Sequence, residues 1–202
     1  MITTSKELIA ALEAKFQTKV SCICCLEKSC IKSPRCTAYH TIELLDFDKI
    51  KDTICHNKRI ESVASVDGIL ERNDTLCFVE LKSWENYLKY QKPKAETDIQ
   101  AQLDTYDLNS KLIESMNICV DESENPDFFK NNISAFILVT DINVEVTPMD
   151  NFRNNLIQLS QTSTKWHCAC NKLSQNKLAQ IKGVNTYYIH CRDFDSYILN
   201  NI

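Results

Sequence analysis

A β-hairpin near the middle of the chain constrains its fold more than any other feature of the sequence. The segments Ser65–Leu70 and Leu76–Ser83 are rich in apolar and β-branched residues, and the polar segment Glu71–Thr75 joins them, with Arg72–Thr75 as the expected loop. Apolar runs that flank a polar turn are typical of two paired strands. Both runs are apolar on both faces, so we expect them at the centre of a covered sheet.

Three charged residues lie inside this apolar hairpin. If Glu71 pairs with Leu76, the antiparallel register places Asp67 opposite Glu80. Side chains alternate along a strand, so Glu80 and Lys82 leave the same face about 7 Å apart. We therefore expect Asp67, Glu80 and Lys82 to converge at one point of the sheet.

An acidic pair beside a lysine fits the chemistry of phosphodiester hydrolysis. Adjacent carboxylates repel each other unless a cation lies between them, and Mg²⁺ or Mn²⁺ prefers such oxygen ligands. A nearby lysine can polarise or deprotonate a metal-bound water, which is the usual nucleophile in this reaction. An acid paired with Lys82 on a solvated strand face fits the same spacing, so the spacing alone leaves both interpretations open.

Two motifs resemble those of a known nuclease family. Asp67, twelve further residues and then Glu80-Leu81-Lys82 resemble the D-(x)n-E-x-K core of the PD-(D/E)XK nuclease superfamily. Gln102 and Tyr106 are similar to the QxxxY motif of the RecB-like branch of that superfamily. The similarity covers residues 65–106 of this chain.

The resemblance implies a fold and a set of roles. It implies an α/β fold with a PD-(D/E)XK restriction-endonuclease-like core, in which helices flank a central mixed β-sheet. The length of the chain indicates a single nuclease-like domain at residues 1–202. It also implies that Asp67, Glu80 and the backbone carbonyl of Leu81 hold Mg²⁺ or Mn²⁺, while Lys82 orients or activates the attacking water. Val66 stands where the family's name-giving proline would be.

The second motif lies on a helix that we expect at Ala95–Asn117. Gln102 and Tyr106 are four residues apart, so they share one face of that helix. The resemblance implies that Gln102 bonds the catalytic lysine, a metal-bound water or DNA, and that Tyr106 packs beneath it or touches a phosphate. The alternative is a core tyrosine beside a solvated glutamine.

The family's upstream metal ligand is expected near Tyr39–Asp52, a run whose pattern fits either a helix or a strand. Glu43 and His40 are the candidates in this run, with His56 and Glu61 behind them. We take Glu43 as the additional magnesium ligand, on the basis of its position alone.

An insertion at residues 20–40 is rich in cysteine. In an intracellular protein such a cluster indicates metal binding before disulfides. The spacing Cys22-x2-Cys25-x4-Cys30-x5-Cys36 could form a tetrahedral structural Zn²⁺ site. A second group near the end of the chain could bind the same ion: His167, Cys168, Cys170, His190 and Cys191. An iron–sulfur cluster joining the two ends, as some RecB-like nucleases carry, and free thiols are the alternatives.

Composition excludes several other classes of protein. Gly68 and Gly183 are the only glycines, so there is no Gly-rich phosphate loop of the P-loop or dinucleotide kind. The sequence has no apolar run of about 18 residues and no signal-peptide core near its start, so we expect a cytoplasmic protein without a membrane partner. The net charge of −4 argues against a basic coat for non-specific DNA binding but does not exclude a nuclease.

The remaining pattern predicts helices and strands around the hairpin. A capping box begins an amphipathic helix at Ser5–Gln17, whereas Asp121–Asn132 has the composition of a loop. The other expected elements are strands at Ile133–Thr140 and Thr186–His190, a strand extension at Val144–Pro148, and helices at Asp150–Gln161 and Asn171–Ile181. Together they predict an α/β sandwich with mixed strand pairing.

We therefore expect a metal-dependent deoxyribonuclease that hydrolyses phosphodiester bonds with a metal-activated water, in DNA repair, restriction or defence against foreign DNA. RNA is the alternative substrate, and a homodimer or a partner subunit is compatible with either. The alternative function is a catalytically weak or inactive module of the same fold that binds nucleic acid or protein and is stabilised by zinc. A zinc-stabilised interaction protein unrelated to nucleases would keep Asp67 and Glu80 far apart.

Overall fold

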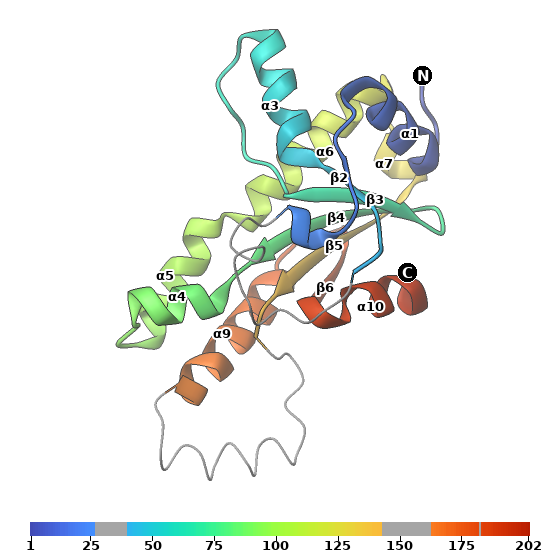
Figure 1. Cartoon of the computed structure of the whole chain (residues 1–202). Coiled ribbons are helices and arrows are strands. Elements are labelled where there is room, and N and C mark those ends of the chain that lie inside the picture. Colours follow the sequence, from blue (N-terminus) through green and yellow to red (C-terminus); the bar gives the residue numbers. More distant parts are fainter. Residues whose placement is uncertain (27–39, 143–162, 182) are drawn as a thin grey trace.

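A six-stranded sheet forms the centre of the computed structural model, which describes residues 1–26, 40–142, 163–181 and 183–202 (Figure 1). Within these residues the strands lie side by side in chain order. They are β1 (Lys19–Val20), β2 (Leu44–Asp46), β3 (Gly68–Arg72), β4 (Thr75–Lys82), β5 (Ile133–Thr140) and β6 (Asn185–His190). Neighbours from β1 to β4 are antiparallel, whereas β4, β5 and β6 are parallel. The predicted α/β class with a mixed sheet is therefore confirmed.

The hairpin has the predicted register. Glu71 pairs with Leu76, and Gly68 pairs with Val79. The turn is tighter than the predicted one, because Asn73 and Asp74 alone form it, with φ angles of 47° and 63°. Two consecutive residues with positive φ give the backbone twist that two-residue hairpins prefer, and Asn and Asp tolerate that conformation well.

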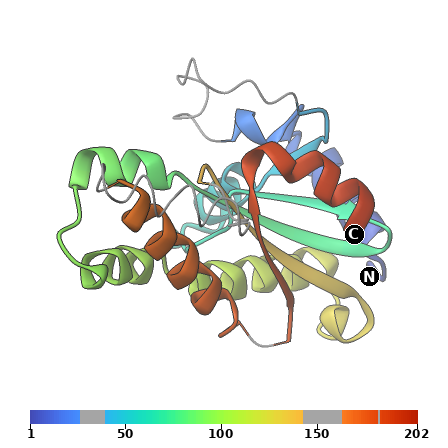
Figure 2. The ribbon, with the colours of Figure 1, turned by 90° about the horizontal axis from the view of Figure 1, so that it is seen from below.

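Helices cover both faces of the sheet (Figures 1 and 2). The helices are α1 (Ser5–Phe16), η1 (Ile23–Cys25), α3 (Phe47–Lys58), α4 (Trp84–Gln91), α5 (Glu96–Tyr106), α6 (Leu108–Ser123), α7 (Phe128–Asn131), α9 (Ser163–Leu178), η2 (Cys191–Asp193) and α10 (Phe194–Asn201). In Figure 2, α10 lies on one side of the sheet and α6 and α7 lie on the other.

Side chains of the central strands alternate between two apolar layers. Leu76 and Phe78 of β4 pack with buried residues of α1, α3, α6 and α7. Cys77 and Val79 point the other way and pack with η1 and α10. Because this alternation has a period of two, Glu80 belongs to the layer of Phe78, on the side of α6. Cys77 and Cys119 are fully buried, as expected of small apolar side chains.

A third cluster joins helices beyond the end of β4. Its fully buried members are Trp84 of α4, Ile99 and Leu103 of α5, and Cys170 of α9. Figure 1 shows these three helices together at the lower left, beside the end of β4 that carries Lys82. This cluster fixes α5 next to the hairpin, so the QxxxY residues lie close to the charged residues of β4.

Several predicted elements agree with the structure. The capping box of α1 is present, since Thr4 Oγ1 accepts a hydrogen bond from the Glu7 amide and Glu7 accepts one from the Thr4 amide. β5 and β6 cover the predicted strands, and the ambiguous run Tyr39–Asp52 contributes β2 and the start of α3. The predicted elements at Val144–Pro148 and Asp150–Gln161 lie outside the described residues.

Two predictions about helices were wrong. The single helix expected at Ala95–Asn117 is two helices, because Asp107 adopts a left-handed conformation with φ of 45° between α5 and α6. The loop expected at Asp121–Asn132 contains the end of α6 and the short helix α7. The structure turns at Asp107 because its side chain accepts a hydrogen bond from the Ser110 amide at 3.4 Å and begins α6 there. Within the described residues, no helix combines the length and apolar character needed to span a membrane.

Asp107 combines two roles that alanine cannot fill. We expect Asp107→Ala to destabilise the protein by about 2 kcal/mol, because it removes the cap of α6 and places a side chain without local hydrogen bonds in the left-handed region. Urea unfolding measures this free energy. Asp107→Asn keeps both properties and serves as the matched control. Equal stability of the Ala and Asn variants would contradict this account of the helix break.

Candidate active site

Glu80 is a fully buried carboxylate on the central strand, with 0% of its surface exposed. Two ammonium groups contact the same oxygen of its side chain. Lys82 Nζ lies 2.5 Å from Glu80 Oε1, and Lys111 Nζ lies 2.7 Å from it. Neither oxygen of Glu80 has a hydrogen-bond partner of good geometry among the described residues. Glu80 is therefore held by two ion pairs at Oε1, and Oε2 has no donor.

Asp67 lies next to this group, directly before β3. Its Oδ2 accepts a hydrogen bond from the Leu81 amide at 2.6 Å, and its backbone carbonyl accepts one from the Phe47 amide at 3.0 Å. Burial and the neighbouring charge of Glu80 raise the pKa of Asp67 to about 7, against the opposing effect of Lys82. Asp67 and Glu80 are thus close enough to perturb each other, contrary to what an unrelated interaction protein would show.

Lys111 is the member of this cluster that the sequence analysis missed. It comes from α6, whose position depends on the helix break at Asp107. The signal that could have found it is charge balance, because two buried carboxylates beside a single lysine leave an uncompensated negative charge. A second cation had to come from another element, but the sequence does not say which one.

Tyr106 supports Lys82 from the side of α5. Lys82 Nζ lies over the Tyr106 ring, 4.9 Å from its centroid, at the distance of a cation–π interaction. The Trp84 ring lies 5.4 Å from the same tyrosine, and burial raises the pKa of the Tyr106 hydroxyl. Gln102 Nε2 donates a hydrogen bond to Thr105 Oγ1 at 3.3 Å. Of the two motif residues, Tyr106 is therefore the one that contacts Lys82.

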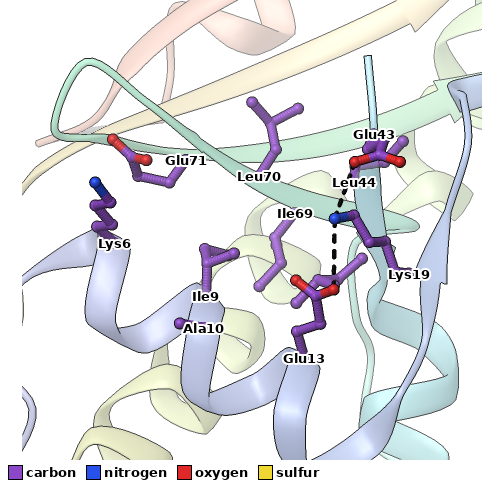
Figure 3. Close-up of a pocket in the computed structure, with 11 residues that line it drawn as sticks. Lys6, Ile9, Ala10, Glu13, Lys19, Glu43, Leu44, Ile69, Leu70 and Glu71 are labelled. Atoms are coloured by element: carbon purple, nitrogen blue, oxygen red, sulfur yellow. Dashed lines mark ion pairs between the residues drawn. The ribbon is translucent and has the colours of Figure 1, made fainter. Parts of the chain in front are cut away.

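Glu43 lies in a different place. It pairs with Lys19 at 2.9 Å, and Lys19 also pairs with Glu13 at 3.4 Å. Figure 3 shows these residues in a surface groove of about 250 Å³ between α1 and the strands β1 to β3. Neither Asp67 nor Glu80 lines this groove. The structure therefore does not bring Glu43 to the hairpin carboxylates.

His40, the other upstream candidate, belongs to the opposite face of the sheet. Its Nδ1 lies 3.0 Å from Asp195 Oδ1, and its ring lies edge-on to Phe194 with the centroids 6.4 Å apart. Phe194 packs in the layer of Val79 rather than in the layer on the Glu80 side. The remaining candidates, His56 and Glu61, are exposed.

Of the predicted zinc ligands, Cys22 and Cys25 belong to the described residues, and their side chains lie close together. Their sulfur atoms lie 3.4 Å apart, and hydrogen bonds from Ser21 and Cys22 lower the pKa of Cys25. Two thiolates bound to one tetrahedral Zn²⁺ lie at a similar separation, so the pair fits half of such a site. Cys30 and Cys36 lie outside the described residues. Cys168 and Cys170 lie on α9, and Cys170 packs in the third apolar cluster.

The hairpin carboxylates fit a divalent cation by their chemistry. Asp67 and Glu80 supply oxygen ligands, which Mg²⁺ and Mn²⁺ prefer, and Glu80 Oε2 is a buried oxygen without a donor among the described residues. In the described part of the chain, this site included, no group of three or more His, Cys, Asp or Glu side chains is arranged to hold a metal. Water and substrate would have to complete the coordination, as they commonly do for Mg²⁺.

The raised pKa of Asp67 predicts a pH-dependent stability in metal-free buffer. Between about pH 4 and pH 7 the unfolded chain loses the Asp67 proton while the folded protein keeps it, so the free energy of unfolding falls as the pH rises. Above about pH 7 the loss in free energy of unfolding is constant at about 4 kcal/mol, since the pKa is raised from 3.8 to about 7. Asp67→Asn removes it, so this variant should be more stable than wild type at pH 8 and similar to it at pH 4.

Urea unfolding between pH 4 and pH 8 with EDTA measures the difference. Asp127→Asn, at an exposed ion pair with Lys130, is the matched control. A difference between wild type and Asp67→Asn that is the same at every pH would show that the pKa of Asp67 is not raised.

Comparisons of the chain with family models, with curated proteins and with solved structures gave no match. The resemblance to the PD-(D/E)XK superfamily therefore rests on the motif residues alone.

Proposed function

We propose that this chain is a divalent-metal-dependent nuclease of the PD-(D/E)XK type that hydrolyses phosphodiester bonds, with DNA as its substrate. The observation that carries this proposal is the buried cluster of Asp67, Glu80, Lys82 and Lys111 on and beside the central strand. Its members come from the D-x12-E-x-K segment and from the element that follows the QxxxY helix.

A structural role accounts poorly for this cluster. Removing charges from water costs several kcal/mol per ion, and apolar residues of similar volume often replace buried ion pairs without loss of stability. The two preceding positions of β4 on the same face are Leu76 and Phe78, so an apolar residue at position 80 would extend the core by one position. Buried charges with perturbed pKa values are typical of catalytic sites.

Each residue has a role that its contacts support. Asp67 and Glu80 would hold Mg²⁺ or Mn²⁺, with the backbone carbonyl of Leu81 as a further ligand. A cation held there supplies the Lewis acidity that phosphodiester hydrolysis requires. Lys82, between Glu80 and the Tyr106 ring, can donate a hydrogen bond to the attacking water or to a phosphoryl oxygen.

The surroundings of the site also suit a nucleic acid. α4 begins two residues after Lys82, and exposed Lys89, Lys92 and Lys94 lie on it and directly after it. Lysines at such positions can contact phosphates along a bound strand, which is how proteins bind nucleic acid without reading its sequence. These contacts would bring the chain's local positive charge to the substrate despite the net charge of −4.

One observation favours a second candidate function. In the described residues the cluster offers two carboxylates and no third acidic or histidine ligand. A module of the same fold that binds nucleic acid or protein but cleaves poorly would have this composition. Cleavage that depends on a metal separates the two functions.

Lys82→Ala tests the nuclease directly. We expect the wild-type protein to cleave linear or circular DNA, single- or double-stranded, with Mg²⁺ or Mn²⁺ and not with EDTA. The variant should lose roughly 10²–10⁴-fold in rate, the usual contribution of a positioned acid–base group. An RNA substrate in the same assay determines which nucleic acid is cut.

Lys130→Ala is the matched control, because Lys130 forms an exposed ion pair with Asp127 at 2.6 Å and lies on α7. Its cleavage rate should equal that of wild type. No cleavage by wild type, or equal cleavage by wild type and Lys82→Ala, would contradict the proposal and favour the binding module.

A further inference from the structure

Lys111 makes an interaction that the motifs do not account for. Its Nζ lies 2.7 Å from Glu80 Oε1, the same oxygen that Lys82 Nζ contacts at 2.5 Å. One oxygen of Glu80 therefore has two cationic partners, while Oε2 has no hydrogen-bond partner in the described part of the chain. Two ammonium groups on one carboxylate oxygen are more than Glu80 needs for neutralisation.

The charges of the cluster balance without a metal. Asp67 and Glu80 carry at most two negative charges, and Lys82 and Lys111 carry two positive charges. A divalent cation bound to both carboxylates, with both lysines in place, would leave two uncompensated positive charges in a buried site. Such an excess is strongly unfavourable in a medium of low dielectric constant. Departure of one ammonium group from Glu80 would reduce this excess from two positive charges to one.

The two lysines differ in their freedom to leave. Lys82 follows Glu80 on the same strand, and its Nζ lies over the Tyr106 ring at 4.9 Å. Lys111 reaches Glu80 from α6, and 21% of its side chain is exposed. Its flexible side chain can turn toward solvent by rotation about its own bonds, without any movement of the sheet.

We propose that Lys111 is an internal counter-cation of Glu80 that competes with the divalent metal for this carboxylate and so weakens metal binding in the free protein. This inference rests on the proposed function, because it takes the metal site to lie at Asp67 and Glu80. The displaced ammonium group becomes available to a phosphate, so metal and nucleic acid would favour each other's binding. Lys111 is thus a positioning residue that sets the metal requirement of the site.

Lys111→Met separates competition from catalysis, because methionine keeps much of the length of the side chain and removes its charge. The experiment titrates Mn²⁺ alone into the full chain and measures free Mn²⁺ by its electron paramagnetic resonance signal. We expect the dissociation constant for Mn²⁺ to fall at least about tenfold in the variant, because a positive charge close to the metal is removed. Adding Glu80→Gln to Lys111→Met should abolish the tighter binding.

Lys58→Met is the matched control. Lys58 also pairs with a single carboxylate, Asp121 at 3.0 Å, but both side chains are exposed and neither contacts Glu80 in the structure. This variant loses the same charge and should bind Mn²⁺ as wild type does. Equal affinities of Lys111→Met and wild type for Mn²⁺ would contradict the proposed competition between Lys111 and the metal. If cleavage then still depends on Lys82, the nuclease proposal holds without a role for Lys111.

If Lys111→Met folds poorly, thermal unfolding with and without Mn²⁺ still tests the proposal. Glu80 keeps only Lys82 in this variant, so the metal-free protein should melt at a lower temperature than wild type. Mn²⁺ should then raise its melting temperature by more than it raises that of wild type. If the metal-free variant is unfolded, Mn²⁺ should restore its native circular dichroism spectrum. No greater effect of Mn²⁺ on the variant than on wild type would overturn the proposal.

Discussion

The buried carboxylate of Glu80 on the central strand needs compensating positive charge, and much of the structure positions the residues that supply it. Glu80 is inaccessible to water, and its charge is held by Lys82 from its own strand and by Lys111 from α6. A buried charge without partners would be costly enough to unfold a domain of ordinary stability. The hairpin, the break between α5 and α6 and the packing of Tyr106 all contribute to holding these partners in place.

The fold reaches this arrangement through local rules and through a few long-range contacts. The two-residue turn at Asn73 and Asp74 sets the register that brings Asp67 beside the end of β4, where the Leu81 amide donates to its carboxylate. The left-handed residue Asp107 ends one helix and begins the next. A shift of the hairpin by one residue would move Glu80 to the opposite face, so register and function are linked.

Local features of this site could be predicted from the sequence because they depend on short distances along the chain. The pairing of Glu71 with Leu76 and the alternation along β4 follow from the positions of apolar and turn residues. Lys111 could not be predicted, because its approach to Glu80 depends on the angle between two helices. The prediction of one continuous helix through Asp107 was wrong for a related reason. A continuous helical pattern in the sequence does not reveal a residue that caps one helix and also turns the chain.

The candidates chosen by position alone show the limit of a resemblance. Glu43 fits the expected region of the chain, yet it pairs with Lys19 in the groove between α1 and the strands β1 to β3 (Figure 3). His40 is held by Asp195 on the far face of the sheet. Glu43 lies between the apolar residues Ile42 and Leu44, followed by Leu45, so no alternation of apolar and polar residues assigns it to one face of the sheet.

The central claim is that Asp67 and Glu80 together bind a divalent cation, and a crystal structure from crystals soaked in MnCl₂ tests it most directly. The account predicts an anomalous difference peak at the manganese absorption edge, roughly 2.0–2.6 Å from carboxylate oxygens of both residues, with the Lys111 ammonium group displaced from Glu80. A map without such a peak at saturating Mn²⁺, in which both lysines still contact Glu80 Oε1, would contradict it.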